Sequence, residues 1–522
     1  MTKPQQKYLH HVKKIAILRA RNFKCLQRKS NRNESIYMSS LEVDPKNRMN
    51  DLDSRRWLQF QKSWFFLSVE TPAEFVAFFT KKVLPNGAAT PQPSRVGIFP
   101  ENAAALQPIL QTLERETVLL HDQLLTASND AARQPELDYV MVDLRQIFTN
   151  EESYNRQVSP WLQRLQATAA LMKPNSYLTI FIRNVDDPPC RLPLAWEFGK
   201  SVGAFLAMKD EKIGCLIGDS ELSKSDPTGN EAKSGNEAIY CLNFRRDVSI
   251  VPAAAAIQMK EIQPPRATEN TSLPPDPHAW FIVKPPPREK KVLLHPAKFP
   301  ETLIAQFIER FTQPGERVFD PMVGTGSALV AAAACGREAY GVELNATFHD
   351  IIKQRFASRP TASKWQVRCG DAGLPETYNE LPASFHYIIT SPPYWDMLRM
   401  KGAETQQYRK QAGLPQFYSD DARDVGNIAD YENFLDRLVK IYCFVGARLE
   451  PGRFMTIIVK NVKKKGQIYP LAWDLSLRLR ENFILGREQF WCQNDQSLAP
   501  FGYRYAWVSN TFHHYCLHFR KP

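Results

Sequence analysis

Two short turns in the second half of the chain carry residue types suited to chemistry. The first runs from Pro321 to Ser327, reads Pro-Met-Val-Gly-Thr-Gly-Ser, and directly follows the strand pattern Arg317–Asp320. An alanine-rich helix is expected after it, over Ala328–Cys335. The order of strand, glycine turn and helix is typical of a loop that binds a nucleotide-like cofactor, because glycines permit a tight turn and let a ligand approach the backbone.

Two carboxylates are expected beside this turn. Glu343 ends the next predicted strand, Glu338–Val342, and Asp371 follows a third predicted strand, Trp365–Cys369. The carboxyl ends of parallel strands meet at one edge of a sheet, and a carboxylate at the tip of the second strand can accept hydrogen bonds from both ribose hydroxyls. The combination favours an adenosine-containing cofactor over a purely structural glycine turn.

The second turn is Ser391-Pro392-Pro393-Tyr394, delivered by the predicted strand Phe385–Thr390. Two prolines fix φ and remove two N–H donors, so the turn is rigid and its carbonyls point outward. A serine hydroxyl and neighbouring carbonyls can accept hydrogen bonds from an amino group, and the tyrosine can stack on a planar ring. These features suit a flipped-out base whose amino nitrogen faces a methyl donor. An ordinary Pro-Pro turn with buried aromatics is the alternative.

Together the two turns resemble the DNA amino-methyltransferases, the family that makes N4-methylcytosine and N6-methyladenine. Phe319–Ser327 is similar to the family's cofactor motif, Thr390–Tyr394 to its catalytic motif, and His295–Pro300 to the segment that closes over the methionine part of the cofactor. The resemblance covers about residues 293–522. It implies a Rossmann-like α/β sheet and S-adenosyl-L-methionine as the cofactor, bound by His295, Phe299, Asp320, Pro321, Gly324, Gly326, Ser327, Glu343 and Asp371.

The resemblance also implies roles for the site residues. Asp320 would lie near the methionine amino group of the cofactor, Glu343 at its ribose and Asp371 near its adenine. The catalytic residues would be Ser391, Pro392, Pro393 and Tyr394. The Ser391 hydroxyl and the Pro392 carbonyl would accept the hydrogens of the target amino group, while Tyr394 would stack on the base.

The first residue of the catalytic motif bears on which base is methylated. Serine at position 391 is similar to the cytosine-N4 branch of the family, whereas adenine enzymes more often carry Asp or Asn there. Met322 stands where the family more often has Phe, a change between apolar residues of similar volume. The substrate implied is duplex DNA with one base flipped out.

The chain also repeats itself. Leu171–Trp196 and Arg448–Trp473 match without a gap, so that Pro174 corresponds to Pro451, and both segments end in Pro-Leu-Ala-Trp. The repeat predicts two copies of one fold within the chain. In the first copy Asp143–Gln146 reads Asp-Leu-Arg-Gln where the second copy has Ser391–Tyr394, and no GxG follows a strand. The first copy is therefore predicted to be inactive, and the chain to be a monomer with an internal pseudo-dimer.

Four segments are predicted from these patterns: a basic arm over 1–48, a degenerate methyltransferase-like domain over 49–255, a proline-rich linker over 256–292 and the catalytic domain over 293–522. The linker is expected to be extended and exposed, because its prolines exclude helix and central strand. The arm holds 12 Lys or Arg against three acids, in a chain of 522 residues with a formal net charge of +12. A disordered tail, or translation from Met38 or Met49, is favoured over a phosphate-binding arm.

No separate recognition domain follows the catalytic motifs. The insertion at about 396–430, rich in Arg, Lys, Gln and Tyr, is expected to contact bases, and the N-terminal copy to serve as a scaffold that contacts phosphates. Lys460 and Lys463–Lys465 form a basic loop after a strand. Two interpretations are open: these lysines contact DNA phosphates, or they are exposed to solvent without a binding role.

Several classes are not supported by the sequence. No apolar run reaches the length of a membrane span, and the N-terminus does not resemble a secretory signal. Nine scattered cysteines without a CxxC pair predict neither a disulfide framework nor a zinc site, so a cytoplasmic protein is expected. The resemblance to DNA methyltransferases implies association with the nucleoid. His513, His514 and His518 are assigned to a structural strand and not to a metal, because Tyr240–Leu242 repeats their pattern without histidines.

The predicted function is site-specific DNA methylation at cytosine N4, with a companion restriction nuclease as a partner that this class allows. Adenine-N6 methylation of DNA and amino-methylation of an RNA base are the enzymatic alternatives. A DNA-binding scaffold with two inactive copies is the non-enzymatic one.

Overall fold

The computed structural model describes residues 50–82, 92–126, 136–187, 190–217, 234–247, 278–283, 299–359, 361–395, 419–464, 466–494 and 509–522. All of them belong to one compact unit, Pro45–Pro522. The predictions for the basic arm, for His295 and for most of the insertion lie outside the described residues. Within the described chain, no helix is both long and apolar enough to cross a membrane.

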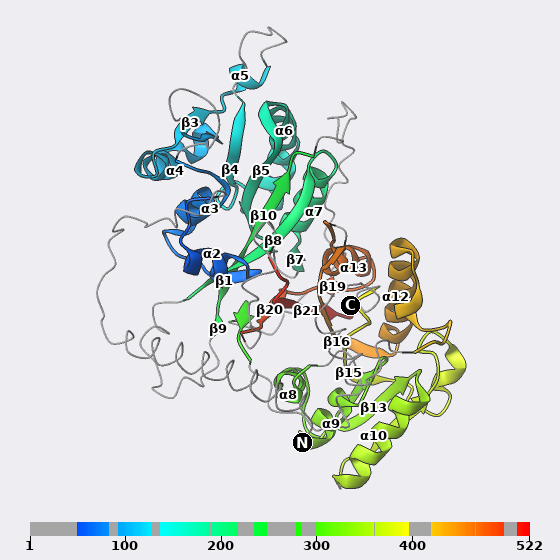
Figure 1. Cartoon of the computed structure of the whole chain (residues 1–522). Coiled ribbons are helices and arrows are strands. Elements are labelled where there is room, and N and C mark those ends of the chain that lie inside the picture. The colour runs from blue at the N-terminus through cyan, green and yellow to red at the C-terminus, as the bar shows by residue number, and fades with distance from the viewer. Residues whose placement is uncertain are drawn as a thin grey trace, which may run out of the picture. The chain divides into compact units, whose positions relative to one another are not determined.

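The C-terminal half is built on a sheet of ten strands (Figure 1). Their order is β14 (Trp365–Cys369), β13 (Glu338–Glu343), β12 (Arg317–Asp320), β15 (Phe385–Thr390), β16 (Leu449–Val459), β21 (His513–Arg520), β20 (Gln489–Cys492), β11 (Trp280–Phe281) and β9 (Ser234–Gly235), with β19 (Ile484–Leu485) paired to β21. The strands from β14 to β16 are parallel, and β21 is antiparallel to β16. A parallel core flanked by one antiparallel strand is the predicted Rossmann-like class.

The N-terminal half repeats this order in a sheet of seven strands. They are β3 (Glu116–Leu119), β2 (Arg95–Ile98), β4 (Leu137–Asp143), β5 (Met172–Ile182), β10 (Glu237–Arg245), β8 (Ala207–Leu216) and β1 (Trp64–Phe66). Strands β3 to β5 are parallel, and β10 is antiparallel to β5. Among the described residues, this sheet lacks counterparts of three strands of the larger sheet, β14, β9 and β19.

Helices cover both faces of each sheet. Those of the N-terminal half are α2 (Ser54–Phe60), α3 (Thr71–Phe79), α4 (Pro100–Thr112), α5 (Asp122–Thr126), α6 (Glu151–Leu171) and α7 (Leu194–Gly203). Those of the C-terminal half are α8 (Glu301–Phe311), α9 (Ser327–Ala334), α10 (Ala346–Ser358), α12 (Tyr431–Gly446) and α13 (Leu471–Leu479), with short 3-10 turns η2 (Pro375–Tyr378) and η4 (Val425–Asn427). The hairpins β6 (Val185–Asp187)–β7 (Cys190–Leu192) and β17 (Val462–Lys464)–β18 (Gln467–Tyr469) complete the two halves.

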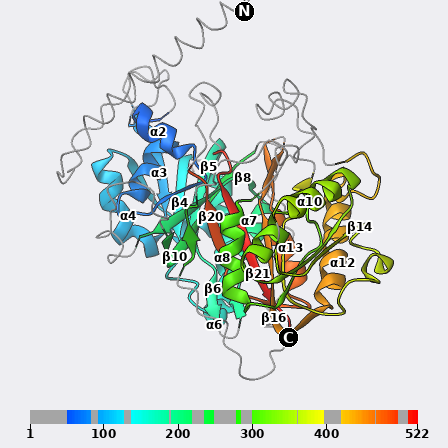
Figure 2. The ribbon, with the colours of Figure 1, turned by 90° about the horizontal axis from the view of Figure 1, so that it is seen from below.

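The alternation of side chains along the strands explains these layers. On β12, Val318 packs in one apolar cluster with α8 and α9, while Phe319 packs in another with α12 and α13. The second cluster also contains α6 and α7 of the N-terminal half, so the two halves share one apolar core. In Figure 2 the strands β20 and β21 lie close to the N-terminal strands β8 and β10.

Matching hydrogen bonds confirm the predicted duplication. The Tyr139 hydroxyl donates to Thr179 Oγ1 at 2.7 Å, and the Tyr387 hydroxyl donates to Thr456 Oγ1 at 2.6 Å. The Ala195 N–H donates to Asn184 Oδ1 at 2.9 Å, and the Ala472 N–H, at the corresponding position of the repeat, donates in the same way to Asn461 at 2.9 Å. Two copies of one fold are expected to form the same hydrogen bonds at corresponding positions of the repeat.

The halves also exchange contacts in equivalent pairs. The Trp64 indole N–H donates to the Gln493 carbonyl at 2.9 Å, and the Trp280 indole N–H donates to the Leu216 carbonyl at 3.0 Å. The linker prediction is wrong at Trp280–Phe281, which form strand β11 and are buried, because these two apolar residues pair with β20 and β9 between the proline groups.

Candidate active site

A cavity opens where the carboxyl ends of β12, β13, β14 and β15 meet. Of the predicted site residues, it is lined by Phe299, Asp320, Pro321, Gly324, Ser327, Glu343, Asp371, Ser391, Pro392 and Pro393. Gly326 belongs to the same glycine turn without lining the cavity, and Tyr394 does not line it either. The structure therefore brings the predicted cofactor loop and most of the predicted catalytic turn to one cavity.

The glycine turn forms because two of its residues take backbone conformations that favour glycine. Gly324 has φ +59° and Gly326 has φ +88°, in the left-handed region. A Cβ atom on Gly326 would also lie 3.1 Å from Ile352. Gly326 is the N-cap of α9, so the N-terminal turn of that helix faces the cavity. Backbone N–H groups at a helix N-terminus favour polar or anionic parts of a ligand.

Asp320 and Glu343 are buried carboxylates at the cavity, 3% and 8% exposed. Asp320 Oδ1 accepts the Met322 N–H at 2.9 Å, and Glu343 Oε2 accepts the Gly324 N–H at 2.7 Å. Among the described residues neither makes an ion pair. Desolvation by burial raises the pKa of Asp320 to about 7 and the pKa of Glu343 to about 8. Both groups would be stabilised in the ionised form by a cationic ligand.

Asp371 differs from these two because it has a cationic partner. The Arg437 guanidinium, from α12, donates to both carboxylate oxygens at 2.7 and 2.9 Å, and the Gly373 N–H donates at 2.7 Å. The pairing fixes the orientation of a side chain that is 7% exposed. Sequence reasoning missed Arg437, since it lies 66 residues beyond Asp371 in a segment without a recognisable motif.

The described end of the insertion also reaches the cavity, through Ser419, Arg423, Asp424 and Val425. Asp424 accepts hydrogen bonds from the Ser419 hydroxyl at 2.7 Å and from the Gly426 N–H at 2.8 Å. These bonds hold the segment that contributes this part of the cavity lining. Residues 396–418, where base contacts were predicted, lie outside the described residues.

The catalytic turn places Ser391 at the cavity and turns Tyr394 inward. The Ser391 hydroxyl donates to the Tyr394 hydroxyl oxygen at 3.3 Å, and the Tyr394 ring packs near His514, with 6.1 Å between ring centroids. The predicted stacking of Tyr394 on a base thus requires the ring to move. The next residue, Trp395, has φ +45°, a conformation that costs a non-glycine residue about 1 kcal/mol or more.

The first copy has different residues at the corresponding positions. Ile98 stands at the end of β2 where Asp320 ends β12, and His121 follows β3 where Glu343 ends β13. Asn102 bonds the Asp143 backbone, donating to its carbonyl at 2.9 Å and accepting its N–H at 3.0 Å. Counterparts of these two carboxylates and of the glycine turn are absent from the described part of this copy, whose inactivity stays a prediction.

Two minor predictions are settled by position. His513, His514 and His518 lie in β21 and are buried, so the assignment to a strand is confirmed; the described residues hold no cluster of three metal-ligating side chains. Both readings of the lysine loop are wrong for Lys460 and Lys463. Lys460 donates to Gln493 and to the Thr511 carbonyl, and Lys463 pairs with Asp210 of the N-terminal half.

Comparison with known proteins finds a family match. Residues 133–354 match the family described as DNA methylase. The matched segment begins shortly before β4 and ends inside α10, so it includes the glycine turn and Glu343 and stops before Asp371 and Ser391. The match extends further into the N-terminal half than the predicted resemblance.

Short segments are similar to individual proteins. YubD of Escherichia coli K12, whose name describes a methylase, is 38% identical over 82 residues, which are 16% of this chain and 36% of YubD. The type II methyltransferase M.MthZI of Methanothermobacter thermautotrophicus is 39% identical over 59 residues, 11% of this chain and 17% of that protein. The orphan methyltransferase M.BamHII of Bacillus amyloliquefaciens is 36% identical over 67 residues, which are 13% of this chain and 25% of that protein. The chain thus spans at most 36% of the length of these relatives.

Solved structures give weaker similarities. TrmN of Thermus thermophilus is 11% identical with a TM-score of 0.28, over 77% of each chain. An rRNA methylase of Streptococcus thermophilus is 14% identical with a TM-score of 0.26, over 43% of this chain and 98% of that one. Similarity of this size supports no statement about function.

Proposed function

The chain belongs to the DNA amino-methyltransferase family, and we propose that it transfers a methyl group to an exocyclic amino group of a base in DNA. The observation that carries this proposal is the shared cavity. Ser391 and Pro392 line the same space as Asp320 and Glu343, so an amino group held by the catalytic turn would face a cofactor held by the glycine turn.

The cofactor of this family is S-adenosyl-L-methionine, and the residues of the cavity fit it. Asp320 and Glu343 are buried carboxylates without an ion pair among the described residues, which suits a ligand that carries a sulfonium and an ammonium group. Asp320 would hold the methionine amino group, Glu343 the ribose hydroxyls and Asp371 the adenine amino group. Bound S-adenosyl-L-methionine supplies a methyl group attached to a positively charged sulfur.

The chain's own residues would make the target nitrogen reactive by position. The lone pair of an exocyclic amino group is delocalised into the ring, so the nitrogen is a weak nucleophile. The Ser391 hydroxyl oxygen and the Pro392 carbonyl would accept hydrogen bonds from its two N–H groups and aim the lone pair at the methyl group. As the nitrogen–methyl bond forms and the sulfur–methyl bond breaks, one amino proton would leave to solvent. Holding both reactants in one cavity supplies most of the remaining rate enhancement. No covalent bond between enzyme and base is needed.

Within this function, cytosine N4 is the proposed target, because Ser391 heads the catalytic turn. Adenine N6 is the alternative within the same fold and the same site. We further propose that the substrate is duplex DNA with a flipped-out base, and that the insertion around 396–430 reads the bases. A monomeric, nucleoid-associated enzyme with a companion restriction nuclease would be consistent with these features.

The test is mass spectrometry of nucleosides from DNA incubated with the full chain and S-adenosyl-L-methionine. N4-methylcytosine is the expected product. N6-methyladenine would overturn the base assignment and keep the site. Cofactor binding without a methylated DNA base would move the substrate to RNA, and no affinity for the cofactor would leave only a DNA-binding scaffold. The Ser391→Ala variant is the control, since it should bind the cofactor and produce no more than traces of methylated base.

A further inference from the structure

The β17–β18 hairpin lies next to the catalytic turn. Its last residue, Tyr469, packs against Trp395 with 4.5 Å between ring centroids, and Lys464 Nζ lies 4.2 Å from the centroid of the same ring. Tyr431 of α12 closes the cluster, 5.2 Å from Trp395 and 5.1 Å from Tyr469. Trp395 directly follows Tyr394, so these contacts hold the exit of the turn that presents Ser391.

Trp395 needs such a support. It has φ +45° and is 4% exposed, and its indole N–H has no hydrogen-bond partner among the described residues. A bulky residue in the left-handed region persists only where its surroundings hold it, and such strain often accompanies functional turns. The packing of Tyr431, Tyr469 and Lys464 around the ring supplies that restraint.

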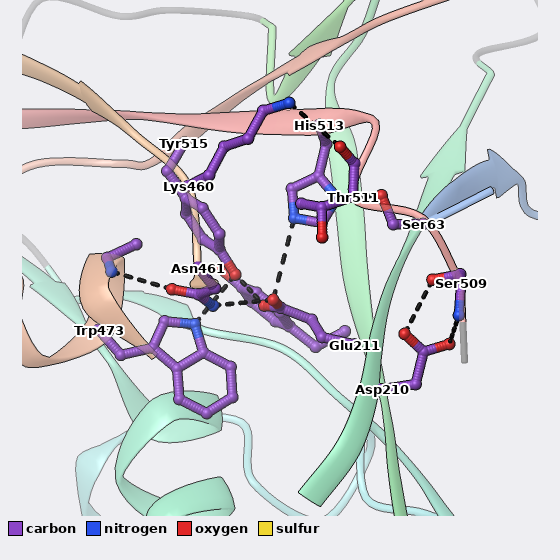
Figure 3. Close-up of polar contacts among 12 residues, drawn as sticks. Ser63, Asp210, Glu211, Lys460, Asn461, Trp473, Ser509, Thr511, His513 and Tyr515 are labelled. Carbon is purple, nitrogen blue, oxygen red and sulfur yellow. Dashed lines mark hydrogen bonds and ion pairs between the residues drawn. The ribbon is translucent and has the colours of Figure 1, made fainter. Parts of the chain in front are cut away.

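The other side of the hairpin is held by the N-terminal half, whose Glu211 faces Asn461 at the base of the hairpin (Figure 3). Lys463 donates to Asp210 of β8, and Lys209 Nζ donates to the carbonyl of Gly466 in the hairpin turn at 3.2 Å. At the base of the hairpin, Asn461 Nδ2 donates to Glu211 Oε2 at 2.8 Å. Successive residues of one N-terminal strand thus bind the base, the strand and the tip of a hairpin in the other half.

The two acids are buried and fully engaged, so their role is to fix a position. Asp210 is 1% exposed and also accepts hydrogen bonds from the Ser509 N–H at 3.0 Å and hydroxyl at 2.8 Å. Glu211 is 3% exposed and also accepts from the Tyr515 hydroxyl. Buried ion pairs contribute little net stability and are better explained as devices that specify one arrangement. Neither residue lines the cavity.

The equivalent contacts of the other half provide a comparison. Glu488, the counterpart of Glu211 in the repeat, holds the β6–β7 hairpin through Arg191 at 2.9 Å and Asn184 at 3.1 Å. That hairpin ends in Leu192, where the C-terminal hairpin has the aromatic residue Tyr469. Only one of the two equivalent contacts therefore connects to a turn with catalytic residues.

We propose that the degenerate N-terminal half positions the catalytic turn, with Asp210 and Glu211 holding the β17–β18 hairpin against Trp395. The proposal rests on the proposed methyltransferase function and assigns both acids as positioning residues. The N-terminal half would then contribute to the reaction by positioning the catalytic turn, without binding cofactor or contacting DNA itself.

The test compares Asp210→Asn with Glu488→Gln in the full chain, because the halves share one core. Each substitution removes one buried carboxylate charge from a contact between one half and the hairpin of the other half. Asp210→Asn should lower kcat about tenfold, because small displacements of a reacting group have large effects on rate, and it should leave the Kd for S-adenosyl-L-methionine unchanged. Glu488→Gln should leave kcat unchanged even if it lowers the thermal midpoint as much.

Hydrogen exchange gives a readout that does not need activity. In Asp210→Asn, the amides of Val462–Tyr469 and of Tyr394 and Trp395 should exchange faster than in the unsubstituted protein, and in Glu488→Gln they should not. Lys463→Met, which breaks the same ion pair from the hairpin side, should reproduce the effect if Asp210→Asn fails to fold.

The outcomes separate the two proposals. Faster exchange in the hairpin without a change at Tyr394 and Trp395 would overturn the positioning role, as would equal losses of kcat in Asp210→Asn and Glu488→Gln. If the unsubstituted protein methylates no base, the proposed function fails, and the exchange of Tyr394 and Trp395 still decides whether the N-terminal half holds the turn.

Discussion

The burial of Glu343 predicts a stability difference whose sign depends on pH. Glu343→Gln preserves the shape of the side chain and removes its ionisation. Glu343 accepts the Gly324 N–H at 2.7 Å and the Asn345 N–H at 2.8 Å, through different oxygens. Glutamine offers one acceptor oxygen to these two donors, so one buried N–H loses its bond, at a cost of about 1–3 kcal/mol. At about pH 5 we therefore expect the variant to be the less stable protein.

The difference in stability between the unsubstituted protein and the variant shrinks or reverses as the pH rises. Burial raises the pKa of Glu343 to about 8, against about 4.3 in an unfolded chain. Between these values the folded protein holds a proton that the unfolded chain has released, so the free energy of unfolding of the unsubstituted protein falls with rising pH. At about 1.4 kcal/mol per pH unit, the loss from this group between about pH 5 and pH 7 is about 3 kcal/mol. The variant has no such loss and should be equally or more stable at about pH 7.

The measurement is denaturant unfolding of both proteins without cofactor, at intervals from about pH 5 to pH 8 and constant ionic strength. Asp320 and the other titrating groups are present in both proteins, so their contributions largely cancel in the difference. A difference in free energy of unfolding that stays constant over this range would refute the reasoning, because it would mean that Glu343 is ionised throughout in the folded protein.

Three further predictions concern the same cavity. Affinity for S-adenosyl-L-methionine, measured by calorimetry, should rise with pH up to about 8, since ionised Asp320 and Glu343 favour a cation; a constant Kd would contradict this. Arg437→Ala should weaken cofactor binding about tenfold by freeing Asp371, and unchanged binding would show that the pair is only structural. Ser391→Ala should lower kcat about a hundredfold with the cofactor Kd unchanged, and full activity would remove Ser391 from the mechanism.

The sequence predicted which turn and which strand ends line the cavity, because these features are local in the chain. A strand, a glycine turn and a helix follow each other within Arg317–Ala334, and their order fixes where the turn lies. Glu343 and Asp371 could be added because parallel strands present their carboxyl ends at one edge of the sheet. The ungapped repeat predicted the second sheet for a similar reason, since strands repeated without insertions keep their pairing.

Features that depend on distant parts of the chain were not predictable in this way. Arg437 reaches Asp371 only because α12 packs beside β16. Lys463 reads as a solvated or phosphate-binding charge until β8, which lies far earlier in the sequence, brings Asp210 to it. A signal did exist for β11, however. Ser63-Trp64-Phe65 and Ala279-Trp280-Phe281 are similar tripeptides, and each Trp-Phe pair lies in a strand of its half's sheet.

The N-terminal copy allows a comparison of the stability that the buried carboxylates of the candidate site remove from the fold. Asp320 accepts the Met322 N–H, but the residue that follows Ile98 at the same distance is Pro100, which has no N–H to donate. A carboxylate at position 98 would thus be buried without a donor and without a cationic ligand. A buried carboxylate with a strongly raised pKa lowers stability at neutral pH by an amount like that worked out for Glu343. Ile98 and His121 are not carboxylates, so the N-terminal copy does not lose stability in this way. Asp320 and Glu343 lower the stability of the protein without cofactor, and a bound cationic cofactor would compensate their negative charges.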